Sequence, residues 1–549
     1  MNFKLNLQKK IERAIVGIWP RLRDNPVVVD INHPPEDKFG DYSSNIAMQL
    51  TSIAQQSPLA IAEAIKDKLG KVPAINRIEI VPPGFLNFYL DDKWLARQMG
   101  IIQKEKNKFG QSNIGGGRRV LLEYVSANPT GPVTMANGRG AFAGDTLANI
   151  MKLSGYTVLR EYYMNDIGNQ VNILAESVLR RYWINQGIKM EYPDYCYQGE
   201  YINDLAKRIN LPNYKLNNIE KIEVVRDKIK SRILQKMISD IKKVLEKKLI
   251  VHYDRWYSEK MLYTSGQVDQ VLRLLKGRGL LYKFEGAIWL KMKKFGDSQD
   301  HVLIKANEDP TYFLSEVAYL WNKFVKRKIN KYILFVGADH HGHAARIQRV
   351  HRMLEFSGTT VVILMQMVRL MRRGQEVKMS KRSGIFITLE ELADEVGLDA
   401  TRFFFLMHDF NTHMDFDMDL ARKKSKDNPV FYVQYAHARI CSIMEKAKTL
   451  AATPVPRGAN LELAKAEKRL IKQLIRWPEL VAEVAQNYQV HRIPFFAIEV
   501  ATIFHEFYTQ CQVIQGKQYN GRRMQLVNTT RIVLQNILSS MGINAPAKM

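Results

Sequence analysis

The sequence predicts an α/β protein with a central domain built on a parallel sheet, a small α/β domain before it, and an all-α bundle after it. Strand-length apolar runs alternate with helical patterns between residues 118 and 385, as is typical of strands joined by crossover helices. Apolar residues at helical spacing fill almost all of residues 426–549. A chain of 549 residues has room for about three or four domains of ~150 residues each.

The first segment mixes helical and strand patterns. Met1–Arg23 alternates basic and apolar residues and lacks the uninterrupted apolar core of a secretory signal, so it predicts an amphipathic helix. Ser57–Leu69 carries apolar residues at helical spacing. Ile78–Val81 and Phe85–Leu90 flank a Pro-Pro-Gly turn and predict the two strands of a hairpin. The glycine run Gly115–Gly117 predicts a linker after this small domain.

The central segment contains two units in which a helix connects two strands. In the first, the apolar run Val120–Val125 ends in a Pro- and Gly-rich turn, the helical pattern Ala141–Leu153 follows, and Tyr156–Tyr163 is again strand-like. Such a unit is expected to be parallel and right-handed. The second unit repeats the order strand, helix, strand at Tyr332–Val336, Ala344–Phe356 and Thr359–Met367.

The rest of the chain is predicted to be helical. Ile173–Leu249 is helical and charged, and it interrupts the central domain as an insertion. Leu389–Val396 and Thr401–Met407 predict short helices. A helical bundle follows from amphipathic spacing in three stretches, which are Phe431–Leu450, Leu461–Gln486 and Leu526–Leu538.

These changes in texture divide the chain into four segments. We expect a small N-terminal domain at 1–115, and a central domain at 116–385 with its insertion at about 173–249. A connecting segment at 386–425 then leads to the helical domain at 426–549.

The charge balance favours a polyanionic partner. The chain has 81 Lys and Arg against 55 Asp and Glu, a formal net charge of +26. On a chain expected to be soluble and cytoplasmic, such a surplus of positive charge most simply indicates a nucleic-acid partner. Composition offers an alternative, because a Lys-, Ile- and Asn-rich sequence can result from an AT-rich genome without any function attached.

Cysteine usage and hydropathy exclude several classes. The three cysteines, Cys196, Cys441 and Cys511, are far apart in the sequence, so they predict neither a disulfide framework nor a four-ligand zinc site. Their scarcity fits a reducing cytoplasm. No apolar run approaches the ~18–20 residues that a membrane span requires, so we expect no membrane association.

The loop Asn128–Gly140 is the first candidate site. In parallel sheets, ligands bind beyond the carboxyl ends of strands. A Pro- and Gly-rich loop at that place lets a nucleotide approach the backbone, and the N-terminus of the following helix favours phosphate. The sequence is not that of a P-loop, since no Gly-x-x-x-x-Gly-Lys-Ser/Thr occurs here. An ordinary strand-to-helix turn is the alternative interpretation.

The second candidate is the basic loop Lys378–Arg382, which has three cations in five residues and is followed by Gly384. Lysines at such a loop act as point charges that can stabilise a pyrophosphate leaving group. Taken alone, the same run could be a solvated basic loop.

Together, the loop after the first strand and Lys378-Met379-Ser380-Lys381 after the last resemble the layout of a class I aminoacyl-tRNA synthetase. Further motifs resemble bacterial arginyl-tRNA synthetase, and the resemblance spans the whole chain. Asp41–Met48 and Gly84–Asn87 are similar to the extra N-terminal domain of that family, and Ala545–Met549 to its C-terminal end. The other matching motifs are Ser126–Pro132, Gly138–Gly140, Glu161–Tyr163, Asn165–Asp166, Gly337–Gly342 and Asn428–Arg439.

The resemblance implies a fold and a reaction. The central domain would be a class I Rossmann-like catalytic domain, the first an additional tRNA-binding domain, residues 386–425 a stem-contact segment, and the bundle an anticodon-binding domain. The reaction would activate L-arginine with ATP to arginyl-adenylate and transfer it to the 3′ end of tRNA(Arg). The expected enzyme is a cytoplasmic monomer that uses ATP with Mg²⁺ as a substrate complex, with few protein ligands to the metal and no structural zinc.

One signature of the family is altered. Where the family has two histidines in a His-x-Gly-His pattern, this chain has Thr134 and Asn137. An amide can still donate to a phosphate oxygen but cannot carry a proton, so we hypothesise that Asn137 is the phosphate donor. With Thr134, it would act alongside Lys378 and Lys381 in catalysis. The ATP-binding residues implied by the resemblance are Pro129, Thr130, Gly131, Asn137, Gly138, Gly140, Asp339, Met379 and Ser380.

The resemblance also points to an acidic pocket for the arginine side chain, since a guanidinium is best met by carboxylates. Glu259, Tyr312 and Glu316 would form it, and Tyr312 and Glu316 are spaced i, i+4, on one face of a helix. The family usually has Asp at the position of Glu316. Glu123 and Asn128 would hold the ammonium and backbone of the substrate. The alternatives are a helix-surface charge for Glu316 and a strand-end cap for the other two.

The stretch His340-His341-Gly342-His343 invites a metal-site interpretation. No set of carboxylates at suitable spacing accompanies it beyond Asp339, so we expect no metal. By resemblance, His340 contacts the amino acid and Asp339 the ribose.

For tRNA, the bundle interleaves aromatic and cationic side chains that could stack on splayed bases. Tyr432 and Tyr435 could instead be core residues at helical spacing, and Phe85 a hairpin packing residue. The implied tRNA-binding residues are Asn45, Phe85, Asn87, Tyr432, Tyr435, Arg439 and Met549.

Two rival functions are open at this point. The missing histidines would suit a tRNA-binding relative that has lost adenylation, although the Lys378/Lys381 loop opposes this. The acidic residues would also suit another cationic amino acid, above all lysine.

Overall fold

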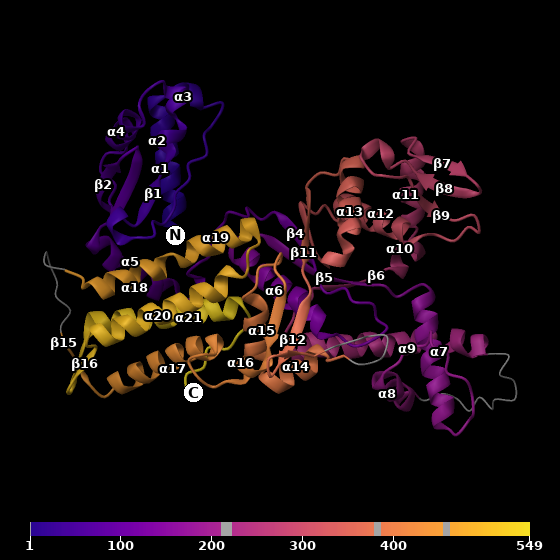
Figure 1. Cartoon of the computed structure of the whole chain (residues 1–549). Helices are drawn as coiled ribbons and strands as arrows, with labels where there is room; N and C mark the ends of the chain where they lie inside the picture. Colours follow the sequence, from indigo (N-terminus) through magenta and orange to yellow (C-terminus); the bar gives the residue numbers. More distant parts are fainter. Residues whose placement is uncertain (1, 210–221, 378–385, 454–461) are drawn as a thin grey trace. The chain divides into compact units, whose positions relative to one another are not determined.

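The computed structural model describes residues 2–209, 222–377, 386–453 and 462–549, without the side chains of His340 and Thr453. It divides into two compact units. One comprises Met1–Ile114, Pro429–Ser540 and Asn544–Met549, and the other comprises Gly115–Asn428 and Met541–Ile543. Figure 1 labels their elements.

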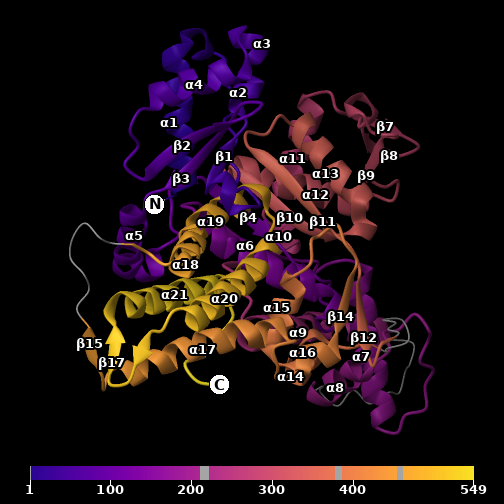
Figure 2. The same ribbon diagram turned by 60° about the vertical axis from the view of Figure 1, so that its left-hand side comes forward.

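The N-terminal part of the first unit is the predicted small α/β domain. Helix α1 (Phe3–Ile18) packs against α4 (Pro58–Leu69), and α4 packs on a three-stranded antiparallel sheet (Figure 2). The predicted hairpin is confirmed as β2 (Ile75–Val81) and β3 (Phe85–Leu90), and β1 (Tyr42–Ser44) lies on the other side of β3. The short helices α2 (Ile46–Gln49) and α3 (Thr51–Ala54) lie between β1 and α4 in the chain.

The rest of this unit is a bundle. Four of its helices overlap the three predicted amphipathic stretches, whereas Arg492–Gln510 forms a helix that none of these stretches covers. Helix α5 (Asp92–Glu105) packs against two of its helices, α18 and α21. A small sheet of β15 (Ala451–Thr453), β17 (Gln518–Asn520) and β16 (Ile514–Gln515) was not predicted. The bundle helices are α17 (Pro429–Ala447), α18 (Lys465–Ile475), α19 (Trp477–Asn487), α20 (Arg492–Gln510) and α21 (Gly521–Ser540).

The stretch Leu461–Gln486 forms two helices, α18 and α19, and its first residue lies outside the described part of the chain. Pro478 stands in the first turn of α19. Proline is tolerated there because the amide groups of a first turn have no partner within their helix. The apolar spacing continues across this break, so it does not mark it.

The second unit is built on a five-stranded sheet in which all neighbouring strands are parallel, as predicted. The order is β11-β10-β4-β5-β6, so the direction of strand succession reverses between β4 and β10. In open α/β sheets that reversal opens a ligand crevice at the carboxyl ends of the two strands. The strands are β4 (Arg119–Glu123), β5 (Thr157–Met164), β6 (Arg255–Ser258), β10 (Lys331–Gly337) and β11 (Thr359–Met365).

Crossover helices leave both strands at this crevice. Helix α6 (Gly138–Leu153) follows β4, and α13 (His341–Met353) follows β10 through the short helical turn Ala338–His340. Between β5 and β6, the predicted insertion forms α7 (Asn169–Asn185), α8 (Glu200–Arg208) and α9 (Ile222–Lys242), and α7 packs against both others (Figure 1).

Short elements that the sequence did not predict complete the unit. An antiparallel sheet of β7, β8 and β9 precedes α12 (Tyr312–Trp321), and β12 pairs with β13 and, in parallel, with β14. The predicted helices at 389–396 and 401–407 are α14 (Leu389–Val396) and α15 (Leu398–Leu406). The remaining elements are α10 (Lys260–Thr264), α11 (Gln267–Gly277), β7 (Leu281–Phe284), β8 (Ala287–Leu290), β9 (His301–Ile304), β12 (Val368–Arg372), β13 (Gln375–Glu376), β14 (Met414–Asp417) and α16 (Met418–Arg422).

Among the described residues, no helix is both long and apolar enough to cross a membrane.

Candidate active site

The loop after β4 leaves the sheet through a strained turn. Val125 and Ser126 have φ values of +68° and +39°, a region that L residues, and β-branched ones above all, rarely occupy. Neighbouring hydrogen bonds hold it. The Tyr163 amide donates to Ser126 Oγ at 3.0 Å, and the Tyr162 hydroxyl donates to the Ala127 carbonyl at 2.8 Å. The chain is therefore fixed where it enters the crevice.

Asn128, Pro129 and Thr130 come next in this loop. Asn128 is exposed, and its Oδ1 accepts from Asn165 Nδ2 at 2.8 Å. Pro129 and Thr130 are buried, and the Thr130 amide donates to the Asn128 carbonyl at 2.7 Å. This compact turn leaves the Asn128 side chain as the group that faces solvent.

Thr134 and Asn137 bond to each other at the entrance of α6. The amide and the hydroxyl of Thr134 donate to Asn137 Oδ1 at 3.0 and 3.1 Å, in a reciprocal capping box. Because Oδ1 accepts both bonds, the amide nitrogen Nδ2 is the donor that remains. No hydrogen bond from Nδ2 to another described residue is found. The two residues that replace the histidine signature thus form a cap, and the N–H groups of Asn137 Nδ2 bond to no other described residue.

The capped turn is paired with the chain that follows the basic loop. The Met135 amide donates to the Ile387 carbonyl at 3.1 Å, and the Leu389 amide donates to the Val133 carbonyl at 2.9 Å. Four predicted site residues of the basic loop, Lys378, Met379, Ser380 and Lys381, lie outside the described residues.

Gly138 and Gly140 have a packing role in this structure. A Cβ on Gly138 would lie 2.7 Å from Phe405 Cζ, and one on Gly140 would lie 3.1 Å from Met365 Cε. Between them, Arg139 is buried and donates to three backbone carbonyls. The two glycines therefore let α6 pack closely; contact with ATP stays a prediction for both.

Three predicted carboxylates gather around Tyr163 on β5. Burial raises the pKa of the Tyr163 hydroxyl well above its usual value, and the charges of Glu259, Glu123 and Glu316 raise it further. These residues come from the end of β6, the end of β4 and α12. The structure thus brings together residues that are up to 193 positions apart, as 316 − 123 shows.

Of Glu259, which follows β6, and Glu316 on α12, Glu259 is the more deeply buried, with 8% of its surface exposed. Burial raises the pKa of its carboxyl to about 7, and the nearby charges of Asp166 and Glu316 add to the shift. Glu316 Oε1 lies 3.1 Å from His343 Nδ1, whereas its buried Oε2 has no hydrogen-bond partner among the described residues. A buried carboxylate oxygen without a partner is costly, so the pocket is arranged to receive a cationic donor.

Glu123 is held by groups that the sequence did not reveal. Its Oε2 accepts from Lys323 Nζ at 2.7 Å and from the Tyr332 hydroxyl at 2.8 Å. Lys323 is only 1% exposed, and its ammonium lies 3.6 Å from the ring centroid of Tyr319 and 3.5 Å from that of Tyr332. Burial lowers the pKa of Lys323 to about 8. One oxygen of Glu123 is therefore already engaged within the protein.

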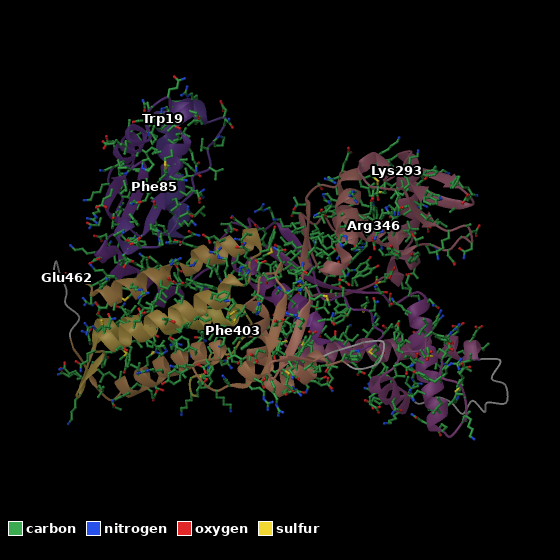
Figure 3. All side chains as sticks on the ribbon, in the orientation of Figure 1. Trp19, Phe85, Lys293, Arg346, Phe403 and Glu462 are labelled. Atoms are coloured by element: carbon green, nitrogen blue, oxygen red, sulfur yellow. The ribbon has the colours of Figure 1, made fainter. Side chains whose placement is uncertain are left out.

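Tyr312 and Glu316 share a face of α12, and Tyr312 is 63% exposed at its first turn. The Arg346 guanidinium, on α13, lies 5.8 Å from the centroid of the Tyr312 ring (Figure 3). Asp339 is exposed in the turn before α13, and His340 follows it, with its side chain outside the description. In the described part of the chain, no group of three or more His, Cys, Asp or Glu side chains is placed to hold a metal.

The predicted tRNA-binding residues all lie in the first unit. On α17, Tyr435 is 44% exposed, and Arg439 places its guanidinium 4.8 Å from the ring centroid of Tyr508. Tyr432 is half-buried, and its hydroxyl donates to Thr502 Oγ1 at 3.3 Å. These side chains form an aromatic and cationic surface on α17 and α20.

The N-terminal candidates differ in accessibility. Phe85 is partly exposed at the start of β3 (Figure 3). Asn87 is buried in the sheet, where its Oδ1 accepts from Ser43 Oγ at 2.6 Å. Asn45 is half-buried and bonds Gln49, and Met549 is exposed.

Models of known families match nearly the whole chain. The arginyl tRNA synthetase N-terminal domain matches residues 5–90, and the class I (R) tRNA synthetase catalytic domain matches residues 98–414. The DALR anticodon binding domain matches residues 433–549.

The chain belongs to the arginyl-tRNA synthetase family.

Relatives in this family match end to end. The arginine–tRNA ligase of Heliobacterium modesticaldum is 38% identical over 568 aligned positions that cover 100% of both chains. That of Moorella thermoacetica is 42% identical, over 94% of this chain and 93% of its own.

Solved structures of the family share the fold. The arginyl-tRNA synthetase of Thermus thermophilus superposes with a TM-score of 0.75 at 20% identity, over 100% of both chains. That of Plasmodium falciparum gives 0.72 at 16% identity, over 100% of this chain and 99% of its own. The predicted fold class, with a class I Rossmann-like catalytic domain and an anticodon-binding bundle, is confirmed.

Several residues of the pocket were missed by the sequence analysis. Tyr163 and Asp166 lie in motifs that pointed to the arginyl-tRNA synthetase family, so the motif itself was the signal for them. Lys323 carried no such signal, because its importance depends on a partner that is distant in sequence. His343 was noted only as part of a possible metal-binding stretch, which did not reveal its contact with Glu316.

Proposed function

We propose that this chain is an arginine–tRNA ligase, which activates L-arginine with ATP and transfers it to tRNA(Arg). In the first step an oxygen of the arginine carboxylate bonds to the α-phosphorus of ATP, and the bond from that phosphorus to pyrophosphate breaks. In the second, a hydroxyl of the terminal ribose of the tRNA attacks the arginyl carbonyl, and AMP leaves. Positioning and charge stabilisation can supply most of the rate enhancement in such a reaction.

The observation that carries the proposal is the acidic pocket at the carboxyl edge of the sheet. It combines Glu259, whose buried carboxyl has a raised pKa, with Glu316 Oε2, which has no hydrogen-bond partner in the described part of the chain. A guanidinium offers several donors in a planar fork and always carries its charge. It would satisfy both acids at once and would lower the pKa of Glu259. A neutral side chain could donate hydrogen bonds but would bring no positive charge to offset the two acids.

Each predicted contact to arginine has a role in this arrangement. Glu259 and Glu316 accept from the guanidinium, and the exposed ring of Tyr312 lies against it. Asn128 and the second oxygen of Glu123 hold the ammonium and backbone, while His340 contacts the same substrate. Because Glu316 replaces the usual Asp, its longer side chain shifts the charge by about one bond.

ATP would occupy the crevice between β4 and β10. The nucleotide would lie close to the backbone of five residues, Pro129, Thr130, Gly131, Gly138 and Gly140. Asp339 would contact its ribose. Asn137 Nδ2 has no partner among the described residues, which supports a hydrogen bond from it to a phosphate, with Thr134 fixing its amide plane. These groups hold the nucleotide at a helix N-terminus, which favours anions.

The basic loop completes the ATP site in this proposal. Lys378 and Lys381 neutralise the departing pyrophosphate, and Met379 and Ser380 contact the nucleotide. Mg²⁺ arrives with ATP as a bridge between its phosphates.

For tRNA, Tyr432, Tyr435 and Arg439 would hold splayed anticodon bases, and the exposed Met549 would add a contact from the C-terminal end. Asn45 and Phe85 would contact the outer corner of the tRNA, and the buried Asn87 would support this surface through its bond to Ser43. The enzyme is proposed to act in the cytoplasm as a monomer. Light scattering by the purified protein measures its molar mass and so tests the monomeric state.

One assay tests the function. Aminoacylation and ATP–pyrophosphate exchange are measured across the amino acids, with and without tRNA(Arg). We expect turnover with arginine only, and exchange only when tRNA is present. Exchange without tRNA would contradict the expected tRNA dependence. Turnover with lysine would indicate a lysine ligase, and no turnover would indicate a tRNA-binding relative without activity.

A further inference from the structure

A side chain of the helical insertion reaches the loop that follows β4. The Tyr201 hydroxyl, in the first turn of α8, donates to the Thr130 carbonyl at 3.0 Å. Beside it, a Cβ on Gly131 would lie 3.4 Å from the same hydroxyl oxygen, so Tyr201 covers the backbone of this loop closely. Helix α8 lies 70 positions beyond Thr130 in the chain, as 200 − 130 shows. The loop proposed for ATP is therefore supported from outside its own strand–helix unit.

The same ring touches the second segment of the site. The centroids of the Tyr201 and Phe386 rings are 6.3 Å apart, with the planes inclined at 57°. Phe386 directly precedes Ile387, whose carbonyl accepts from the Met135 amide. Tyr201 thus lies against both chain segments that border the crevice on this side.

The Tyr201 side chain stands on a well-packed helix, and its hydroxyl keeps its proton. Ile202, Leu205 and Ala206 bury one face of α8, which packs on α7. Burial raises the pKa of the Tyr201 hydroxyl well above its usual value, and the neighbouring Tyr197 and Tyr192 add to the effect. The hydroxyl remains a donor throughout the pH range in which enzymes are assayed.

We propose that Tyr201 is a positioning residue, through which the helical insertion sets the conformation of residues 129–131 for ATP. The proposal rests on the proposed function only in placing ATP at this loop. A hydrogen bond to a backbone carbonyl fixes a peptide plane, and a small displacement of a positioning group is enough to weaken binding or rate. The end of the arginine pocket that receives the guanidinium, formed by Glu259 after β6 and by α12, makes no use of this bond, whereas Asn128 belongs to the same loop and accepts from the Thr130 amide.

The test compares three variants of the full chain. Tyr201→Phe keeps the ring against Phe386 and removes only the hydroxyl. We expect its KM for ATP to rise by about two- to tenfold, the range for one neutral hydrogen bond, with a smaller rise in KM for arginine, which is affected only through Asn128. Tyr201→Leu also removes the ring contact and should raise KM for ATP further. The matched control is Tyr192→Phe. In the wild type the Tyr192 hydroxyl donates to the Tyr197 carbonyl at 2.6 Å within the insertion, so losing it should leave KM for ATP and KM for arginine unchanged.

The outcomes are separable from those of the proposed function. An unchanged KM for ATP in Tyr201→Phe would overturn the proposal. So would equal rises in both KM values with a lower melting temperature, because that pattern indicates a folding role alone. Calorimetric titration with ATP needs no turnover. If the wild-type chain failed to charge arginine but Tyr201→Phe still weakened ATP binding, only the proposed function would be wrong.

Discussion

At the scale of single residues, Glu259 makes arginine binding depend on pH. Burial raises its pKa to about 7, and only the carboxylate can accept from a guanidinium. Affinity for arginine should therefore fall as pH drops through 7. Between pH 8 and pH 6, KM for arginine is expected to rise about tenfold, as follows from one proton with this pKa. KM for ATP over the same pH range is the control, and a flat arginine profile would contradict the assignment.

The same carboxyl should lower stability at high pH. Its folded-state pKa of about 7 exceeds the ordinary 4.5, so the stability that the neutral form contributes is complete below 4.5 and is lost as pH rises through 7. Glu259→Gln removes this loss, by on the order of 1–3 kcal/mol at pH 8. We expect this variant to melt higher than the wild type at pH 8, to match it at pH 4.5, and to bind arginine at least about 100-fold more weakly. Equal melting temperatures of the variant and the wild type at pH 8 would show that burial of the Glu259 carboxylate does not lower stability.

Lys323 and Glu123 form the second residue-scale test. Lys323→Met leaves a buried carboxylate with Tyr332 as its partner, which should cost about 3–5 kcal/mol of stability. The double variant Lys323→Met with Glu123→Gln removes the charge as well and should recover most of that loss. Chemical denaturation of the four proteins in the cycle measures the coupling. Additive losses would mean that the 2.7 Å pair contributes no coupling energy.

At the scale of elements, the cap of α6 joins the fold to the chemistry. Asn137 uses Oδ1 for the cap and keeps Nδ2 as a donor, so the two roles can be separated. Asn137→Asp keeps the acceptor but loses the donor, and Asn137→Ala loses both. We expect both to slow adenylation by about 100- to 1,000-fold, by analogy with loss of one transition-state donor, but only Asn137→Ala to lower the melting temperature. Wild-type adenylation in Asn137→Ala would exclude the proposed role.

Local pattern predicted the elements with strong periodicity. Four of the five parallel strands and the crossover helix α6 follow directly from apolar runs and spacing, whereas β6 was not predicted. The strands β7, β8, β9, β12 and β14 have four or five residues each, too few for a period to be recognised. The break between α18 and α19 was hidden because amphipathic spacing continues across it.

The site shows the same division. Family motifs pointed to Glu259, Glu316 and Tyr312, and α12 does place the last two on one face. The buried ion pair of Lys323 and the contact of Tyr201 with Thr130 arise from tertiary packing between segments far apart in sequence. No spacing rule within one element can reveal such contacts.

At the scale of the whole molecule, the surplus of 26 positive charges contrasts with a pocket lined by acids. The two features serve different partners in the proposed reaction. A polyanion is attracted by the net charge over long range, whereas a cationic amino acid needs a small region of opposite sign that is shielded from that field. Burial of Glu259 and the pairing of Glu316 with His343 keep those charges local.

This contrast predicts different responses to salt. Counterion release makes tRNA binding salt-dependent, so KM for tRNA should rise at least about tenfold between 50 and 200 mM salt. KM for arginine should change much less, because partly buried charges are screened weakly. Initial rates of aminoacylation at several salt concentrations, with each substrate varied in turn, measure both. If KM for tRNA did not respond, the basic surplus would be explained by composition alone; if KM for arginine responded as steeply, its pocket would have to be open to bulk solvent.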